Sequence, residues 1–201
     1  MSTKLQLINS ALILIGDLPL DSLTGTTRAH VVSNALYDNI VQNELSKFRW
    51  GFARRQAQCV AAVTPGSSDP IVPLFDYSNS YFVPTGMLSL IRLSPSVNYQ
   101  IYGEPDSPET DRQQVIYTNY SGDLFADYIH NMPENEWPAY FSKMIEYALG
   151  MDFAPAIRDS AVSMELLANQ YQNASRMARF TDSQQHPQTP IQDRPFIDVR
   201  R

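Results

Sequence analysis

The hydrophobic residues of this chain change their spacing twice, and this constrains the fold more than any other feature of the sequence. Before Phe48 and after Pro138, apolar residues recur every three or four positions, which is the period of an amphipathic helix. Between these stretches they alternate with polar residues, as in a strand. The order predicts an α+β fold: a bundle of about four α-helices, an inserted antiparallel β-domain and an extended C-terminal tail.

The helical stretches have recognisable ends. Thr3 and Gln6 match a capping box, and Gly16 is a suitable C-cap. The second stretch lacks Gly and Pro and would form a helix roughly 33 Å long at ~1.5 Å per residue. Pro155 is expected to end or break the third helix, and the fourth should have one apolar face and one face rich in Gln and Asn. The expected helices are 3–16, 27–48, 138–155 and 160–179.

The middle of the chain has the pattern of short strands separated by turn formers. Val97, Tyr99 and Ile101 alternate with Asn98 and Gln100, and Pro or Gly residues separate this run from its neighbours. The expected strands are 52–62, 77–83, 88–93, 97–102, 114–118 and 124–129. We therefore assign 1–50 and 138–179 to the helical bundle, 51–137 to the β-domain and 180–201 to the tail.

The tail contains three prolines, no helical stripe and a late apolar cluster. Such a segment is expected to be extended and to become ordered only on a partner. The residues predicted to dock are Pro190, Ile191, Arg194, Pro195, Phe196, Ile197 and Val199.

The charge is uneven along the chain. Residues 1–60 carry six Lys/Arg and four Asp/Glu (+2), residues 61–137 carry two and ten (−8), and residues 138–201 carry seven and seven (0). An acidic middle argues against a DNA-binding surface along the whole chain. The single cysteine, Cys59, excludes a disulfide within the chain and is expected to be buried. Because no apolar run approaches the length of a membrane span, we expect a protein made in the cytoplasm without membrane contact.

The sequence contains few signs of a catalytic, metal-binding or cofactor-binding site. His30, His130 and His186 lack partners at metal-ligand spacing, and no phosphate-binding or nucleophile motif occurs. We therefore expect no metal, no cofactor and no enzymatic activity. Acidic pairs in the β-domain, Asp106 with Glu109 and Asp123 with Asp127, leave one alternative: a glycan hydrolase acting on the host envelope through two carboxylates.

The segment FRWGFARRQAQ at 48–58 connects the second helical stretch to the first strand-like stretch. Phe48, Trp50 and Phe52 alternate as at a strand entry, and they are expected to fill the junction between bundle and sheet. Arg54 and Arg55 would then be available to carboxylates of a neighbouring subunit. A weaker alternative is contact of these two arginines with DNA, which would be salt-sensitive.

Several blocks in this order resemble the head-to-tail adaptor of short-tailed bacteriophages, also called tail tubular protein A. The blocks are FRWGFARRQAQ, YFVPTGMLSLIRL, VNYQIYGE, VIYTNYSGDLFADYI and WPAYFSKMIEYALG, and the resemblance spans about residues 1–179. The residues at the family's positions are Trp50, Phe52, Ala53, Tyr81, Pro84, Leu88, Tyr128, Ile129, Pro138 and Phe141. Val83 and Gly86 depart from the family pattern, which has Leu and Asp there.

The resemblance implies a structural role in the virion tail, at the head–tail junction. Family members form a dodecameric ring between the portal protein and the tail nozzle protein, with possible contacts to tail fibres. The genome passes through the bore during ejection without sequence-specific binding. In this family the helical bundle carries an inserted β-domain, and the C-terminus docks on the portal.

Overall fold

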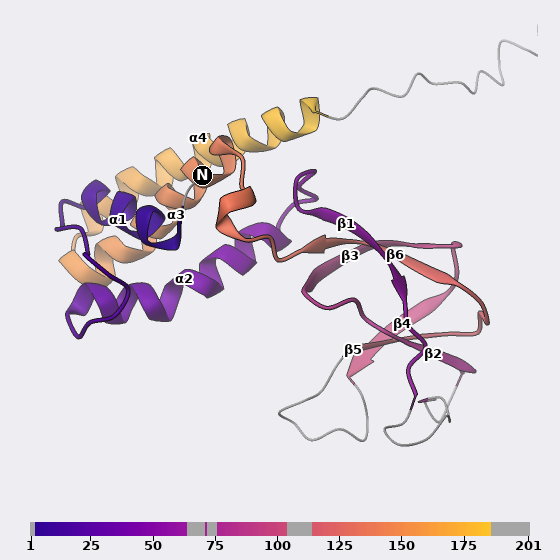
Figure 1. Cartoon of the computed structure of the whole chain (residues 1–201). Coiled ribbons are helices and arrows are strands. Elements are labelled where there is room, and N and C mark those ends of the chain that lie inside the picture. Colours follow the sequence, from indigo (N-terminus) through magenta and orange to yellow (C-terminus); the bar gives the residue numbers. More distant parts are fainter. Residues whose placement is uncertain (1–2, 64–70, 72–75, 104–113, 186–201) are drawn as a thin grey trace, which may run out of the picture.

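The computed structural model describes residues 3–63, 71, 76–103 and 114–185, and it has the expected α+β fold (Figure 1). Two helices precede a β part, and two helices follow it. In the described residues the helices are α1 (Lys4–Leu14), α2 (Arg28–Ser46), the short 3-10 helix η1 (Glu134–Glu136), α3 (Ala139–Arg158) and α4 (Ala161–Gln184). The strands are β1 (Arg54–Cys59), β2 (Asn79–Phe82), β3 (Met87–Ser94), β4 (Tyr99–Gly103), β5 (Gln114–Thr118) and β6 (Leu124–His130).

Local capping explains where α1 begins and ends. The Thr3 hydroxyl accepts from the Gln6 N–H at 3.3 Å, and the Gln6 side chain accepts from the Thr3 N–H at 3.0 Å, which confirms the capping box. Gly16 has φ of +75°, and the Asp17 N–H reaches the Leu12 carbonyl at 2.9 Å. This left-handed residue after the helix is the αL ending that favours glycine.

Two expected helix ends are wrong. Pro155 lies inside α3, which continues to Arg158 and ends where Asp159 adopts a left-handed conformation, with φ of 52°. The missing N–H of the proline costs one hydrogen bond in the last turns of the helix, and α3 continues past it. Helix α4 continues beyond Arg179 to Gln184, so the first residues assigned to the tail, 180–184, are helical.

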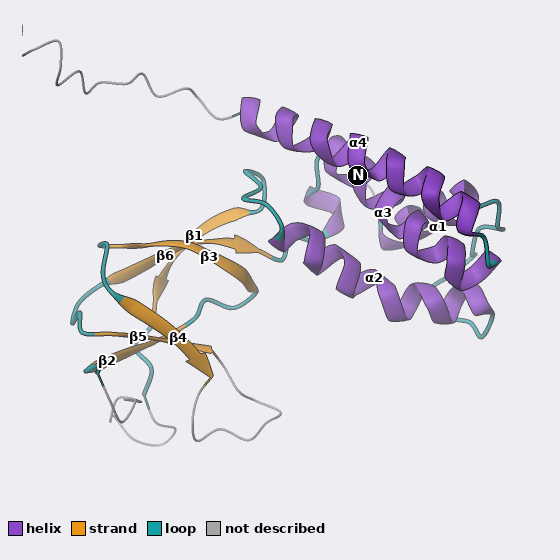
Figure 2. Ribbon diagram, turned by 180° about the vertical axis from the view of Figure 1, so that it is seen from behind, coloured by secondary structure: helices purple, strands orange, loops and turns teal. Residues whose placement is uncertain are grey.

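The β part consists of two three-stranded antiparallel sheets, ordered β1–β6–β3 and β2–β5–β4 (Figure 2). In β6, Leu124, Ala126 and Tyr128 face the second sheet and pack with residues such as Tyr81 and Ile116. The sheets therefore stack around their own small core. Cys59 is buried in this core, as predicted, and burial raises the pKa of its thiol to about 11.

A larger core fills the helical bundle and extends into the β part. Helix α3 packs against α1, α2 and α4, and its Phe141 and Phe153 are fully buried. Trp50, from the segment before β1, and Ile129, from β6, belong to this same core. The helical and β parts are therefore joined by continuous packing rather than by a bare linker.

Candidate assembly surfaces

The junction is built from the aromatic segment that follows α2. The Trp50 ring lies 5.0 Å from the rings of both Phe48 and Phe141, and the Phe52 ring lies 4.9 Å from Phe141. The Trp50 indole N–H donates to the Glu44 carbonyl at 3.0 Å. All three aromatics of the segment thus lie between the bundle and the β part. They do so from a turn, because β1 begins only at Arg54 and not at Phe52.

The arginines after this turn have acidic partners within the chain. The buried Asp127 carboxylate accepts from Arg54 Nε at 2.7 Å, from Arg54 Nη2 and from Arg92 Nε at 3.0 Å. These hydrogen bonds, Arg54 first, lower the pKa of Asp127. Arg55 Nη2 lies 3.8 Å from Glu136 Oε2. Arg54 is therefore engaged in tying β1 to β6, which reduces its availability to DNA.

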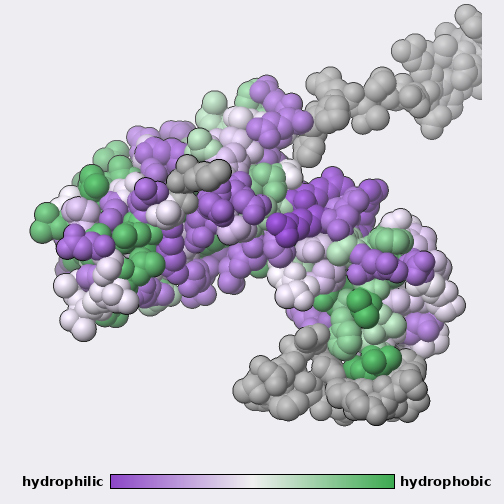
Figure 3. All heavy atoms as spheres, viewed as in Figure 1, coloured by the Kyte–Doolittle hydropathy of each residue, from purple (hydrophilic) through white to green (hydrophobic). Residues whose placement is uncertain are grey.

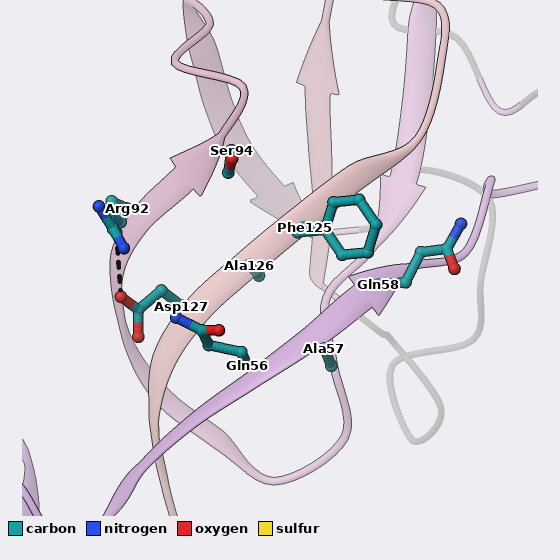
Figure 4. Close-up of a pocket in the computed structure, with 8 residues that line it drawn as sticks. All are labelled: Gln56, Ala57, Gln58, Arg92, Ser94, Phe125, Ala126 and Asp127. Atoms are coloured by element: carbon teal, nitrogen blue, oxygen red, sulfur yellow. Dashed lines mark hydrogen bonds and ion pairs between the residues drawn. The ribbon is translucent and has the colours of Figure 1, made fainter.

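The outer face of the β1–β6–β3 sheet carries a hollow of about 370 Å³ (Figure 4). Phe125, which is 45% exposed, lies beside Gln58, Ser94 and the Arg92–Asp127 pair. A mixed aromatic and amide surface of this kind is typical of protein interfaces.

Where the structure describes them, the carboxylates named for the hydrolase alternative are held by other side chains. Asp127 has a lowered pKa and two arginine partners, which does not suit the general acid of a glycosidase, a carboxyl with a raised pKa. Asp123 accepts from the Gln58 amide at 3.0 Å. Asp106 and Glu109 lie outside the described residues.

Sequence reasoning missed a buried polar network that links α2 to α4. The Glu44 carboxylate, 4% exposed, accepts from Tyr171 Oη at 2.7 Å and from Lys47 Nζ at 2.5 Å. Burial, with a further contribution from Glu44, raises the pKa of the neighbouring Asp152. The helical pattern of the sequence does not distinguish the buried Glu44 from an exposed glutamate, because its burial depends on a partner, Tyr171, in another helix.

The last turns of α4 present a mixed surface that the sequence pattern did not reveal. Met177 and Phe180 are 61% and 56% exposed, and each directly follows an exposed arginine, Arg176 and Arg179 respectively. These two arginines also line a hollow of about 430 Å³ with Tyr171, Gln172 and Ser175. We call Arg176, Met177, Arg179 and Phe180 the α4 ridge.

A further hollow, of about 240 Å³, lies between α2 and η1. Its wall includes Tyr37, whose hydroxyl donates to Glu134 Oε1 at 3.1 Å, and Asp38, which pairs with Lys4 at 2.9 Å. Burial and Glu134 raise the pKa of Tyr37. We call the hollow lined by Tyr37, Asp38, Gln42, Met132 and Glu134 the α2–η1 groove.

The described residues contain no cluster of three or more His, Cys, Asp or Glu side chains able to hold a metal ion. His30 Nδ1 lies 2.6 Å from Thr27 Oγ1, His130 packs edge-on against Tyr128, and His186 is outside the described residues. Within that part of the chain, no helix is both long and apolar enough to span a bilayer.

The predicted docking residues of the tail all lie outside the described residues; they are Pro190, Ile191, Arg194, Pro195, Phe196, Ile197 and Val199. No protein-family model and no curated protein matches the chain.

Proposed function

We propose that the chain is a structural virion protein: a ring-forming head-to-tail adaptor that joins the portal to the tail nozzle of a short-tailed bacteriophage. In this role it forms part of the channel through which the genome is ejected. The observation that carries the proposal is the architecture around Trp50. A helical bundle is interrupted by a β part, and the family-like aromatic block packs where the two meet. This is the arrangement that the resemblance implies.

Two further features support the proposal. Helix α4 ends at Gln184, so a segment with the composition of a docking tail begins at the end of the bundle that adjoins the β part (Figure 1). The −8 charge of residues 61–137 disfavours retention of DNA, because like charges repel the phosphates.

The test is binding to purified portal rings of the same phage. The full chain is compared with a chain ending at Gln185 and with a full-length chain in which 186–201 are scrambled at constant composition. Truncation after Phe180 would be unsuitable, because it removes Asp182, whose carboxylate accepts from the Gly51 N–H at 2.9 Å. Truncation after Gln185 keeps this contact and the whole of α4.

If only the full chain binds, both the adaptor role and the docking role of the tail are supported. Equal binding by all three chains would keep the adaptor role and reject the tail as the docking element. Failure of all three to bind portal rings would reject the adaptor proposal itself.

A further inference from the structure

The α4 ridge has the composition of a protein interface. Met, Phe and Arg are enriched where proteins bind one another, and here they are adjacent on one helix. Met177 and Phe180 each expose more than half of their side chains. Figure 3 shows hydrophobic and hydrophilic residues side by side over this end of α4.

The arginines of the ridge are not neutralised. In the described part of the chain, no carboxylate lies within ion-pair distance of Arg176 or Arg179. The Arg179 guanidinium lies over the Phe48 ring, 5.8 Å from its centroid, and this contact restricts its orientation. The ridge thus presents two cations beside two apolar side chains.

The α2–η1 groove has the complementary character. It contains the carboxylates of Asp38 and Glu134 beside the exposed apolar ring of Pro133, and Lys4 compensates only Asp38. The Asp38 side chain is 66% exposed, so its carboxylate is accessible to a partner. The groove lies on α2 and η1, whereas the ridge lies on α4, so the two are different surfaces of the chain.

We propose that the α4 ridge of one copy docks on the α2–η1 groove of a second copy. The inference rests on the proposed function and specifies its subunit contact. A contact of ridge with ridge about a two-fold axis would bring four arginines together, which like-charge repulsion disfavours. Contact between two different surfaces is heterologous, and such contacts generate rings when the rotation closes.

Nucleic acid is the less suitable occupant of the ridge. Phosphate binding depends on a dense set of cations. The ridge has two arginines, and the exposed Met177 and Phe180 beside them offer nothing to a phosphate. An acidic protein surface with apolar side chains beside it pairs with the two arginines of the ridge and also covers Met177 and Phe180.

Charge exchange tests the proposal with full-length protein. One variant reverses the ridge (Arg176→Glu with Arg179→Glu), a second reverses the groove (Asp38→Lys with Gln42→Lys), and a third carries all four substitutions. The groove variant leaves Glu134 in place because Glu134 accepts from the buried Tyr37 hydroxyl. Arg28→Glu is the matched control, since Arg28 is an exposed arginine at the start of α2, without a carboxylate partner among the described residues.

Assembly is measured by sedimentation velocity over a concentration series, alone and on portal rings, after thermal melting has shown that each variant is folded. Each two-substitution variant should assemble about tenfold more weakly than wild type, or worse, which corresponds to about 1.4 kcal/mol. The four-substitution chain and an equimolar mixture of the two variants should recover, because each then offers matched surfaces. Arg28→Glu should assemble like wild type.

Unchanged assembly of the ridge variant would overturn the inference, and loss of salt-sensitive DNA binding in that variant would then identify the ridge as a nucleic-acid surface. Weaker assembly of the two variants without recovery in their equimolar mixture would also overturn the inference, because the ridge would then contact a surface other than the groove. In both cases, a wild type that still assembles on portal rings leaves the adaptor function intact. A wild type that neither self-associates nor binds portal rings rejects the adaptor function as well.

Discussion

Replacing Trp50 with alanine should destabilise the whole fold rather than one part of it. The side chain is 1% exposed and contacts Phe48, Phe52 and Phe141 at ring distances of 5.0, 6.0 and 5.0 Å. A buried Trp→Ala change costs about 3–5 kcal/mol, and the lost hydrogen bond to the Glu44 carbonyl adds about 1 kcal/mol. We expect a loss of about 4–6 kcal/mol, a large share of a typical domain stability of about 5–15 kcal/mol.

Because Trp50→Ala can leave too little stability to measure, Trp50→Phe provides a second value. Phenylalanine keeps most ring contacts and loses the indole N–H, so we expect a loss of about 1–2 kcal/mol. Urea unfolding is followed by the helical circular dichroism signal and by fluorescence of Trp137. The Trp137 ring lies 5.1 Å from Phe141 and therefore reports on the same junction. The urea midpoints from the circular dichroism and from the fluorescence should fall by the same amount.

Phe125→Ala is the control, since this aromatic residue is partly exposed on the outer sheet face and its loss should change stability by less than about 0.5 kcal/mol. The reasoning is refuted if Trp50→Ala costs under about 1 kcal/mol, or if it costs no more than Phe125→Ala. It is also refuted if the helical signal unfolds with an unchanged midpoint while Trp137 fluorescence shifts, because the junction would then not couple the two parts.

Gly86→Ala should cost about 1–3 kcal/mol, because Gly86 has φ of +75° and an added Cβ would lie 2.6 Å from His130 Cε1. At Gly103 an added Cβ would lie within 4 Å of no atom in the described part of the chain, so Gly103→Ala should change the thermal midpoint little, and equal effects would contradict the steric argument. The pKa of Asp127 is lower in the folded protein than in the unfolded chain, where it is about 3.9. The ionised Asp127 carboxylate therefore stabilises the fold above that pH, and this contribution is lost as the pH falls through the folded-state pKa. Urea midpoints from about pH 6 to about pH 3 should therefore fall more for wild type than for Asp127→Asn, and equal slopes would contradict the assignment.

The parts of the fold that the sequence predicted are those with local signals. The α1 cap needs only Thr3 and Gln6, and β5 was predicted at its observed bounds, 114–118, because a short run of β-branched and aromatic residues marks it. The end of α4 was predicted too early. The buried face of this helix continues from Ala178 to Asp182, and a polar residue at that position does not extend the apolar pattern in the sequence. Only tertiary partners, Tyr140 and the Gly51 amide, make burial of that carboxylate possible.

The surfaces could be predicted less well, because they depend on register. Arg54 and Asp127 are 73 positions apart and meet because β1 pairs with β6 so that Gln56 lies opposite Asp127. Arg92 joins them because it lies opposite Asp127 in the β3–β6 pair. A sequence gives the residue types but not which strands become neighbours. The sequence alone accordingly did not identify Asp127 as a partner of Arg54 within the chain.

The carboxylate of Asp182 connects the end of α4 to the start of the β part. Oδ2 accepts from the Gly51 N–H at 2.9 Å, and Oδ1 accepts from the Tyr140 hydroxyl at 2.8 Å. Because Asp182 is 1% exposed, separating α4 from Gly51 would leave a buried carboxylate poorly satisfied. The point at which the tail leaves α4 is thus fixed relative to the segment that enters β1. For the adaptor that we propose, a portal bound to the tail and a nozzle bound to the β part would therefore act on one rigid unit.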